Sequence, residues 1–262
     1  MCAGRPKSEA GRQEKGVGMV KFLPAGECAL AVECGNEINE SINRQVRALY
    51  DQIQKGQLRG VTEAVPTFRS LLVYYDPCVI SYGRLVRKLK RLVKKAGDIR
   101  ETQPVIYEIP VCYGGGYGED LAYVAEHAGI TEEEVIRRHC GRDYRIYMLG
   151  FLPGFPYLGG MDESIVTPRL QNPRTRIPAG SVGIGGKQTG IYPIDSPGGW
   201  QLIGRTPLVL YDPNRESPIL YQAGDYIRFC PVSSEEYERL KKEAEAGRLT
   251  VTTAKGGVRN GD

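Results

Sequence analysis

Histidine is scarce in this sequence, and the seven cysteines are scattered. Only His127 and His139 occur in 262 residues, and no CxxC pair is present. A zinc ribbon, a thioredoxin-type redox pair and a disulfide scaffold all need paired, closely spaced residues, so none of these sites is expected. The sequence therefore predicts reduced thiols and no bound metal.

Long apolar runs are also lacking. No stretch approaches the roughly 18–20 apolar residues of a membrane span. No apolar segment follows the basic residues near the N-terminus, as a secretory signal would require. Hydrophobic residues make up 41% and charged residues 25%, which is ordinary for a globular protein. We expect a soluble, cytoplasmic protein with no membrane partner.

Acidic residues are nearly absent from one segment. Residues 81–100 hold eight Lys/Arg and one Asp, an excess larger than the net charge of +4 of the whole chain. A basic excess confined to one segment is unlike the footprint of a nucleic-acid-binding protein, so no nucleic-acid partner is expected. We interpret the segment as the solvated face of an amphipathic helix. Contact with an acidic partner surface or with nucleic acid is the alternative.

Glycine and proline are abundant by contrast, with 33 and 17 residues, which indicates a turn-rich fold. The length favours two domains. We predict an α+β protein with a disordered arm at 1–18, an α/β domain at 19–100, a β-barrel domain at 101–246 and a flexible tail at 247–262. Met19 is a candidate for the natural start.

The first domain alternates strands and helices. Strands are predicted at Val20–Leu23, Ala29–Val32 and Ser70–Tyr75. Apolar residues recur mostly at 3–4-residue steps from Ile38 to Ile53, which predicts a helix that Asn36 can cap. A second helix over 84–95 carries its basic residues on one side. This pattern favours a small ferredoxin-like α/β sandwich.

The second domain begins with a predicted strand at Val105–Val111 and two short helices within 117–140. Thr131 and Glu134 form a capping box between these helices, and Ile130 can pack on Val135. Further short strands are predicted at Tyr144–Leu149, Ser181–Ile184, Leu208–Tyr211 and Tyr226–Phe229. Residues 150–204 between them contain 12 Gly and 7 Pro. Short strands with such turns favour an all-β barrel or sandwich.

The segment GFLPGFPYLGG, residues 150–160, interleaves glycine, proline and aromatic residues. Such a segment is unlike a helix or a central strand, because proline removes a donor and glycine has no side chain to pack. An ordered loop could present Phe151, Phe155 and Tyr157 as a recognition wall. The alternative is that these rings only fill the mouth of a barrel.

The segment from Arg176 to Pro207 is rich in glycine but matches neither common phosphate-binding motif. Ser181 and Gln188 stand where a Walker A loop needs Gly and Ser/Thr, and Gln188 also occupies the third glycine position of GxGxxG. Its polar groups could instead bind a carboxylate, amide or phosphate, with free backbone N–H groups at Gly198 and Gly199 and an apolar wall at Trp200. The polar side chains are Lys187, Gln188, Thr189, Tyr192, Ser196 and Arg205. Plain β-turns with polar groups facing water are the alternative.

His139 precedes Cys140, and two interpretations stay open. Neighbours in sequence rarely point at one another, which disfavours a Cys–His nucleophilic pair. A buried, hydrogen-bonded His139 is favoured over a lone general acid or base.

Several long segments, in their order along the chain, resemble the B-subunit family of 5-oxoprolinase. They are FLPAGECALAVECG, VPTFRSLLVYYDP, YGGGYGEDLAYVAEHAGITEEEVIRRH, GFLPGFPYLGG, TPRLQNPRTRIPAGSVGIGGKQTGIYPIDSPGGWQLIGRTP and YQAGDYIRF. This family is also known as KipI or allophanate hydrolase subunit 1, and it is related to part of the carboxyltransferase domain of urea carboxylase. The resemblance runs from about Val20 to about Tyr237. Gly116 and Lys187 depart from the family pattern, which more often has Glu and Gly there.

The resemblance implies a cyclophilin-like β-barrel behind the small α/β domain. The resemblance also implies that this chain acts as one subunit of a complex with the C and A subunits of 5-oxoprolinase. Together these subunits open 5-oxoproline to L-glutamate with ATP hydrolysis. ATP is the implied cofactor. No ATP-binding motif can be assigned to this chain, so a subunit interface is the candidate place for the nucleotide.

Our site hypothesis is a barrel cleft that the C subunit completes. It is lined by Gln188, Thr189, Tyr192, Ser196, Gly198, Gly199 and Trp200. Arg176 and Arg205 would bind the substrate carboxylate or a phosphate, for which a bidentate guanidinium is well suited. His139 is the weaker candidate for proton transfer.

Two other functions stay open. KipI-like members inhibit a sporulation histidine kinase, which would make a histidine kinase the partner and binding the only activity. Carboxyl transfer from biotin, as in urea carboxylase, would need a biotin carboxylase partner, and this chain has no biotinyl-lysine motif of its own.

Overall fold

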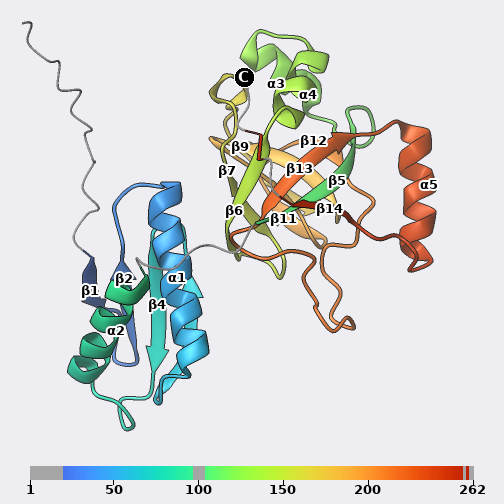
Figure 1. The fold of residues 1–262 in the computed structure, drawn as a ribbon. Helices are drawn as coiled ribbons and strands as arrows, with labels where there is room; N and C mark the ends of the chain where they lie inside the picture. The colour runs from blue at the N-terminus through green and yellow to red at the C-terminus, as the bar shows by residue number, and fades with distance from the viewer. Residues whose placement is uncertain (1–19, 97–103, 256–257, 260–262) are drawn as a thin grey trace, which may run out of the picture.

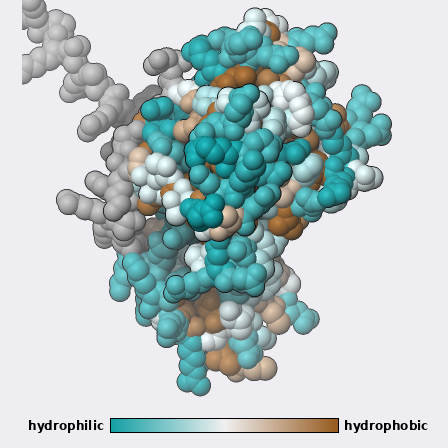
Figure 2. All heavy atoms as spheres, turned by 90° about the vertical axis from the view of Figure 1, so that its right-hand side faces the viewer, coloured by the Kyte–Doolittle hydropathy of each residue, from teal (hydrophilic) through white to brown (hydrophobic). Residues whose placement is uncertain are grey.

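The computed structural model describes residues 20–96, 104–255 and 258–259, which form two lobes side by side (Figure 1). The predicted arm at 1–18 and Met19 lie outside the described residues. No helix in the described part of the chain is long and apolar enough to cross a membrane. The face of the molecule that bears the last helix is mostly hydrophilic, with only small, separate hydrophobic areas (Figure 2).

The N-terminal lobe is an antiparallel sheet with two helices on one face. Its elements are β1 (Lys21–Pro24), β2 (Ala29–Glu33), α1 (Glu40–Gly56), β3 (Val61–Pro66), β4 (Ser70–Tyr75) and α2 (Tyr82–Ala96), with the strand order β1-β2-β4-β3. Val46 and Leu49 of α1 and Leu85 of α2 pack on the same buried cluster as the sheet. The seven Lys/Arg side chains that α2 carries are all exposed, which confirms an amphipathic helix.

Two details of this lobe differ from the sequence prediction. Asn39, not Asn36, caps α1, because its extended backbone lets Oδ1 accept a 2.8 Å hydrogen bond from the Ser41 N–H. In a ferredoxin-like fold the strand beside β2 would follow α2. Here β1, which precedes β2, takes that edge, so the structure supports only the coarser description of a small α/β domain.

The second lobe is a nearly closed β-barrel. Its strands are β5 (Val105–Tyr113), β6 (Asp143–Leu149), β7 (Pro156–Gly159), β8 (Arg174–Ile177), β9 (Ser181–Gly185), β10 (Gln188–Ile191), β11 (Ser196–Gly198), β12 (Gln201–Arg205), β13 (Tyr226–Pro231) and β14 (Thr252–Lys255). Its helices are α3 (Leu121–Ala128), α4 (Glu132–Cys140), the short 3-10 helix η1 (Glu163–Ile165) and α5 (Ser234–Glu245). The sheet runs β10-β9-β12-β5-β13-β6-β7, and its two end strands contact each other, while β8 and β11 form a separate two-stranded antiparallel sheet.

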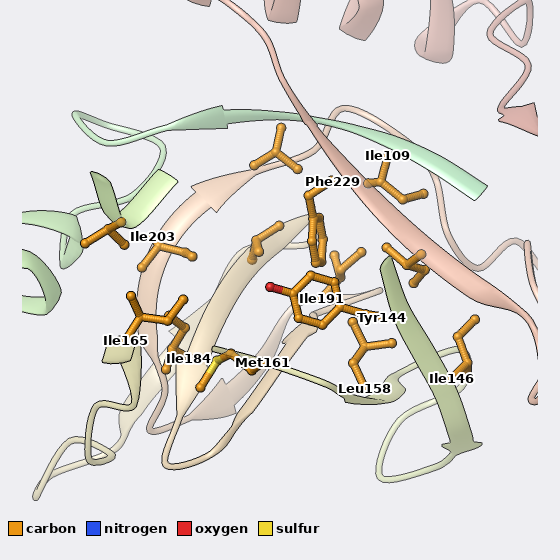
Figure 3. Close-up of a cluster of buried hydrophobic side chains, with 14 of the residues drawn as sticks. Ile109, Tyr144, Ile146, Leu158, Met161, Ile165, Ile184, Ile191, Ile203 and Phe229 are labelled. Atoms are coloured by element: carbon orange, nitrogen blue, oxygen red, sulfur yellow. The ribbon is translucent and has the colours of Figure 1, made fainter. Parts of the chain in front are cut away.

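The barrel interior is filled by large apolar side chains from nearly every strand. Figure 3 shows Tyr144 and Phe229 at its centre, with isoleucines from β5, β6, β9, β10 and β12 around them. The helix pair closes this core, because Leu121 and Val135 belong to the same buried cluster. The predicted cap between the helices is confirmed, since Thr131 Oγ1 accepts a 3.3 Å hydrogen bond from the Glu134 N–H.

Two predictions in this lobe are wrong. Leu208–Tyr211 is not a strand, and only Tyr211 forms an isolated bridge with Ile219. Leu208 and Leu210 are apolar because they are buried in the core, and the single hydrogen bond from the Leu220 N–H to the Leu210 carbonyl does not extend into a strand. The predicted tail from 247 contains β14, which pairs with the first half of β5. That half has no pairing with β12, because β12 pairs with β5 only at Cys112 and Tyr113.

The two lobes are joined through Asn43, a fully buried polar residue of α1. Its side-chain amide donates to the Tyr147 carbonyl of the barrel at 3.1 Å, and also lies 3.3 Å from the carbonyls of Thr67 and Phe68. Arg145 of β6 reaches Asn43 Oδ1 and the Glu40 carboxylate. This polar junction fixes the N-terminal lobe against strand β6 of the barrel.

Replacing Asn43 by Ala should lower the free energy of unfolding by about 1–3 kcal/mol, because buried carbonyls lose their donor. Urea denaturation followed by circular dichroism measures this loss. Arg44→Ala, which removes only an exposed ion pair with Glu40 on the same helix, is the matched control and should cost at most about 1 kcal/mol. Equal, small effects of both changes would contradict the assigned junction.

Candidate functional site

A second, smaller buried cluster lies outside the barrel core, between the two-stranded sheet of β8 and β11 and the strands β9, β10 and β12. Phe155, Tyr192 and Trp200 meet edge-to-face, with ring centroids 5.3–6.1 Å apart, and Ile177 and Leu202 complete the cluster. Such aromatic contacts contribute stability beyond the area that they bury. This region holds most of the residues that the sequence predicts as a site.

Trp200, the only tryptophan of the chain, lies on a face of β9 and β10 that is made of glycine. A Cβ atom at Gly185 would overlap the Trp200 indole, and one at Gly190 would lie 3.1 Å from it. The glycines of this segment therefore make room for a ring. They do not form a phosphate loop.

The predicted aromatic wall at residues 150–160 is divided between packing and exposure. Phe155 is buried in the aromatic cluster, whereas Phe151 is 63% exposed and touches Phe155 edge-to-face, with ring centroids 5.6 Å apart. Phe151 also has a positive φ of 66°, which is strained for a bulky residue. Exposed and strained, Phe151 is the part of the wall that faces outward.

Asp120 and Arg174 hold this region together, and sequence reasoning missed both residues. Arg174 Nη2 donates to both oxygens of Asp120, at 2.8 and 2.9 Å, and Asp120 Oδ2 also accepts the Leu202 N–H at 2.6 Å. Arg174 Nη1 in addition reaches the Trp200 carbonyl at 3.2 Å. One available signal was Asp120 at the start of a helix, which looks like a cap but makes no capping hydrogen bond.

The two predicted arginines have different surroundings. Arg176 is exposed and pairs with Asp195, with Nε and Nη2 2.8 and 2.6 Å from Oδ2. Arg205 is half-buried, and its side chain makes no hydrogen bond or ion pair with any residue that the structure describes; its Nε is one of the buried atoms without a partner. Of these two arginines, Arg205 is therefore the one with a positive charge open to an anion.

The remaining predicted residues fall on two sides of the sheet. Ser196 is buried and pairs with Ile177 of β8, and Gly198 lies against Tyr192 and Ile177, where a Cβ atom would come within 2.6 Å of the Tyr192 hydroxyl. Gly199 follows beside Pro173, and Gln188 begins β10. Thr189, by contrast, points into the barrel. The structure thus brings Tyr192, Ser196, Gly198, Trp200 and Arg205 into one region and separates Thr189 from it.

His139 lies in the barrel core. Its Nε2 is 2.8 Å from Thr189 Oγ1, which donates to the Gly183 carbonyl, so Nε2 carries the proton and donates. Its Nδ1 then accepts from the Tyr113 hydroxyl at 2.8 Å. Burial lowers the pKa of His139 to about 3, so the ring is neutral. This is the buried, hydrogen-bonded histidine that the sequence favours, and its role in proton transfer stays a prediction.

Cys140 does not pair with His139. Its thiol donates to the Tyr113 hydroxyl at 3.3 Å, and burial raises its pKa to about 11. A thiol that stays protonated is a poor nucleophile. The six cysteines in the described part of the chain are free, and no group of three or more His, Cys, Asp or Glu there is placed to hold a metal ion.

Comparison with known proteins places this geometry in a family. The model of the carboxyltransferase domain, subdomain C and D, matches residues 20–221. The B subunit of 5-oxoprolinase from Bacillus subtilis (strain 168) is 44% identical over 229 residues, which are 84% of this chain and 95% of that protein.

Solved structures agree with the fold. The crystal structure of TTHA0988 is 39% identical with a TM-score of 0.70, and the match covers 82% of this chain and 41% of that one. The urea amidolyase of K. lactis, at 22% identity, shares the fold alone, with a TM-score of 0.74 over 90% of this chain and 16% of its own. This chain thus spans less than half of either structure.

The low pKa of His139 predicts a pH-dependent stability. The unfolded histidine has its ordinary pKa near 6.5, so only the unfolded state gains this proton as the pH falls below that value, and stability is lost. Relative to His139→Gln, the wild type should lose about 2 kcal/mol of unfolding free energy between pH 7 and pH 5. Urea denaturation at each pH measures this. The exposed His127→Gln is the control, and a wild-type advantage that stays constant with pH would contradict the neutral, buried ring.

Gly185→Ala should disturb Trp200 selectively. The added methyl group overlaps the indole, so we expect a loss of about 1–3 kcal/mol in stability. A shifted emission spectrum should accompany it, since Trp200 is the only tryptophan. Gly116→Ala, at an exposed glycine with open space around it, should leave both unchanged. Wild-type emission from Gly185→Ala would overturn the packing of Trp200 on glycine.

Proposed function

The chain belongs to the B-subunit family of 5-oxoprolinase, and from this membership we propose that it is the B subunit of an ATP-dependent 5-oxoprolinase. In this reaction 5-oxoproline is opened to L-glutamate while ATP is hydrolysed, and the A and C subunits take part. The observation that carries the proposal is the identity of 44% over 95% of the Bacillus subtilis protein. That match runs through both lobes.

The chemistry explains why ATP is needed. The amide bond of 5-oxoproline lies in an unstrained five-membered ring, so ring strain does not help water to open it. Transfer of a phosphoryl group from ATP to the amide oxygen turns that oxygen into part of a leaving group and makes the carbonyl carbon open to attack by water. Breakage of the carbon–nitrogen bond then leaves an acyl phosphate of glutamate, with ADP already released, and a second water hydrolyses it to L-glutamate and phosphate. We place the nucleotide at a subunit interface, because this chain carries neither phosphate-binding motif.

The region around the aromatic cluster is our candidate for this chain's share of the active site. Tyr192, Trp200 and the backbone at Gly198 and Gly199 form a rigid wall, and the half-buried Arg205 offers an unpaired positive charge beside it. Phe151 projects from the same cluster with most of its ring exposed, which suits contact with the C subunit. Gln188 lies at the margin of this wall. His139 and Thr189 support it from the barrel side, so His139 acts in this proposal as a positioning residue.

Phosphate release by the assembled enzyme tests the proposal. The full chain is mixed with the A and C subunits from the same source, with and without 5-oxoproline, and phosphate and glutamate are measured. We expect phosphate release that needs 5-oxoproline and all three proteins, with glutamate formed in step. Omitting each protein in turn is the control. A complex that co-purifies but shows no stimulation by 5-oxoproline would refute the proposed function.

A further inference from the structure

We propose that Ser181, Ser196 and Arg205 form a binding site for a carboxylate, the carboxylate of the small cyclic substrate. This inference rests on the proposed function for the identity of the substrate. The site itself is inferred from three polar groups close to the aromatic cluster. Each is buried or half-buried and has no hydrogen-bond partner among the described residues.

Two serine hydroxyls carry the first step. Ser181 is fully buried and Ser196 is 6% exposed, and the Oγ atom of each has no hydrogen-bond partner among the described residues. Buried polar atoms in folded proteins are nearly always paired, because an unpaired one keeps the full cost of leaving water. Two such hydroxyls in one region therefore call for a group that is absent from the chain itself.

Strand register places Arg205 beside Ser181. The two residues are direct partners in the antiparallel pair of β9 and β12, so their side chains leave the sheet on the same face. Side chains alternate between the two faces of β9, so Ser181 lies on the same face as Gly183 and Gly185, which Trp200 covers. Val182 and Ile184 lie on the opposite face and point into the barrel. Arg205 thus extends on the outer face next to Ser181, with its Nε buried and unpartnered.

Backbone hydrogen bonds bring Ser196 to the same place. The Ala179 N–H donates to Asp195 Oδ1 at 2.8 Å, and the Gly180 N–H donates to the Tyr192 carbonyl at 2.7 Å. These bonds tie the segment that leads into Ser181 to the segment that leads into Ser196. Ser196 is the register partner of Ile177, a member of the aromatic cluster, so its side chain faces inward with that cluster.

The charges favour an anion of modest size. Asp195 is an acidic group near Arg205, but its hydrogen bonds and ion pair go to Arg176, so the Arg205 guanidinium makes no hydrogen bond or ion pair with a described residue. A guanidinium and two hydroxyls match the two oxygens of a carboxylate. The adjoining Tyr192 and Ile177 form an apolar wall that suits the methylene groups of a small ring. Phosphate shares the anionic chemistry and is distinguished by experiment.

The unpaired hydroxyl of Ser181 predicts that its removal does not lower the stability of the ligand-free chain. Ser181→Ala removes a hydroxyl that has no partner, so the ligand-free full chain should unfold at an equal or higher temperature than the wild type. The same change should weaken carboxylate binding by about tenfold. A lower unfolding temperature would show that the hydroxyl is held by a structural water, and would overturn the site.

Arg205→Gln is compared with Arg91→Gln, a change at an exposed arginine of α2 in the other lobe. Binding of 5-oxoproline, of its neutral carboxamide and of inorganic phosphate to the full chain is followed by NMR shift titration up to about 20 mM, where even a dissociation constant of about 1 mM is measurable. We expect 5-oxoproline to bind the wild type and Arg91→Gln alike, to bind Arg205→Gln at least about tenfold more weakly, and the carboxamide to bind poorly. Binding of phosphate but not of 5-oxoproline, equal binding by both variants, or no binding at all would overturn the proposal.

The assembled enzyme separates this inference from the proposed function. Turnover by the wild type together with unchanged KM for 5-oxoproline in Arg205→Gln would refute the site and leave the function standing. No turnover by the wild type, combined with Arg205-dependent binding of 5-oxoproline or another small carboxylate to the chain, would refute the function and leave the site standing. A raised KM in Arg205→Gln with wild-type unfolding temperature would support both.

Discussion

The carboxylate of Asp120 is the group on which the arrangement of the site depends. The two-stranded sheet of β8 and β11 is not part of the barrel sheet, so something must fix it against the barrel. Asp120 does so by accepting hydrogen bonds from Arg174 on β8 and from the Leu202 N–H on β12. Charge-assisted, two-oxygen pairing of this kind is stronger and more directional than a neutral hydrogen bond. Trp200, which follows β11, then covers the glycine face of β9, and the aromatic cluster forms around it.

Apolar periodicity explains how much of this fold could be predicted from the sequence. Four of the five α-helices and seven of the fourteen strands in the described residues were located within a few residues, because a buried face imposes a period of 3.6 or 2 on the apolar residues. The short strands β3, β7, β8, β10, β11 and β12 and the helix α5 were not predicted. The strand predicted at Leu208–Tyr211 failed because burial alone produces the same apolar signal without pairing. β14 was missed because Thr252 to Lys255 form a strand only by pairing with the part of β5 that has no pairing with β12. The position of unpaired backbone groups in a distant strand leaves no signal in the local sequence.

The site was predicted less completely, for a reason that lies in strand alternation. The interval from Gln188 to Tyr192 was identified as polar, but which of its residues face outward depends on the strand register, which the sequence alone does not give. Thr189 consequently turned out to face the barrel and His139. Asp120 and Arg174 were not found, because their separation of 54 positions in the sequence makes their pairing a property of the folded chain. Arg176 was predicted as a site residue and Arg174 was not, because the partners of the two arginines become known only from the folded chain.

The outer region combines features that cost free energy in the isolated chain. Phe151 holds a left-handed backbone conformation and exposes its ring, Arg205 has no partner among the described residues, and Ser181 and Ser196 bury unpaired hydroxyls. Each of these costs would be of order 1–3 kcal/mol or less, and a stable barrel core can carry them. Unfavourable features of this kind concentrate at functional sites, where a protein is built to bind another molecule. The described part of the chain satisfies nearly every buried polar group elsewhere, including Asn43, His139 and the Arg228–Asp143 pair. The contrast between a satisfied core and an unsatisfied outer region is the reason that we propose this region as the place where substrate and partner subunit meet.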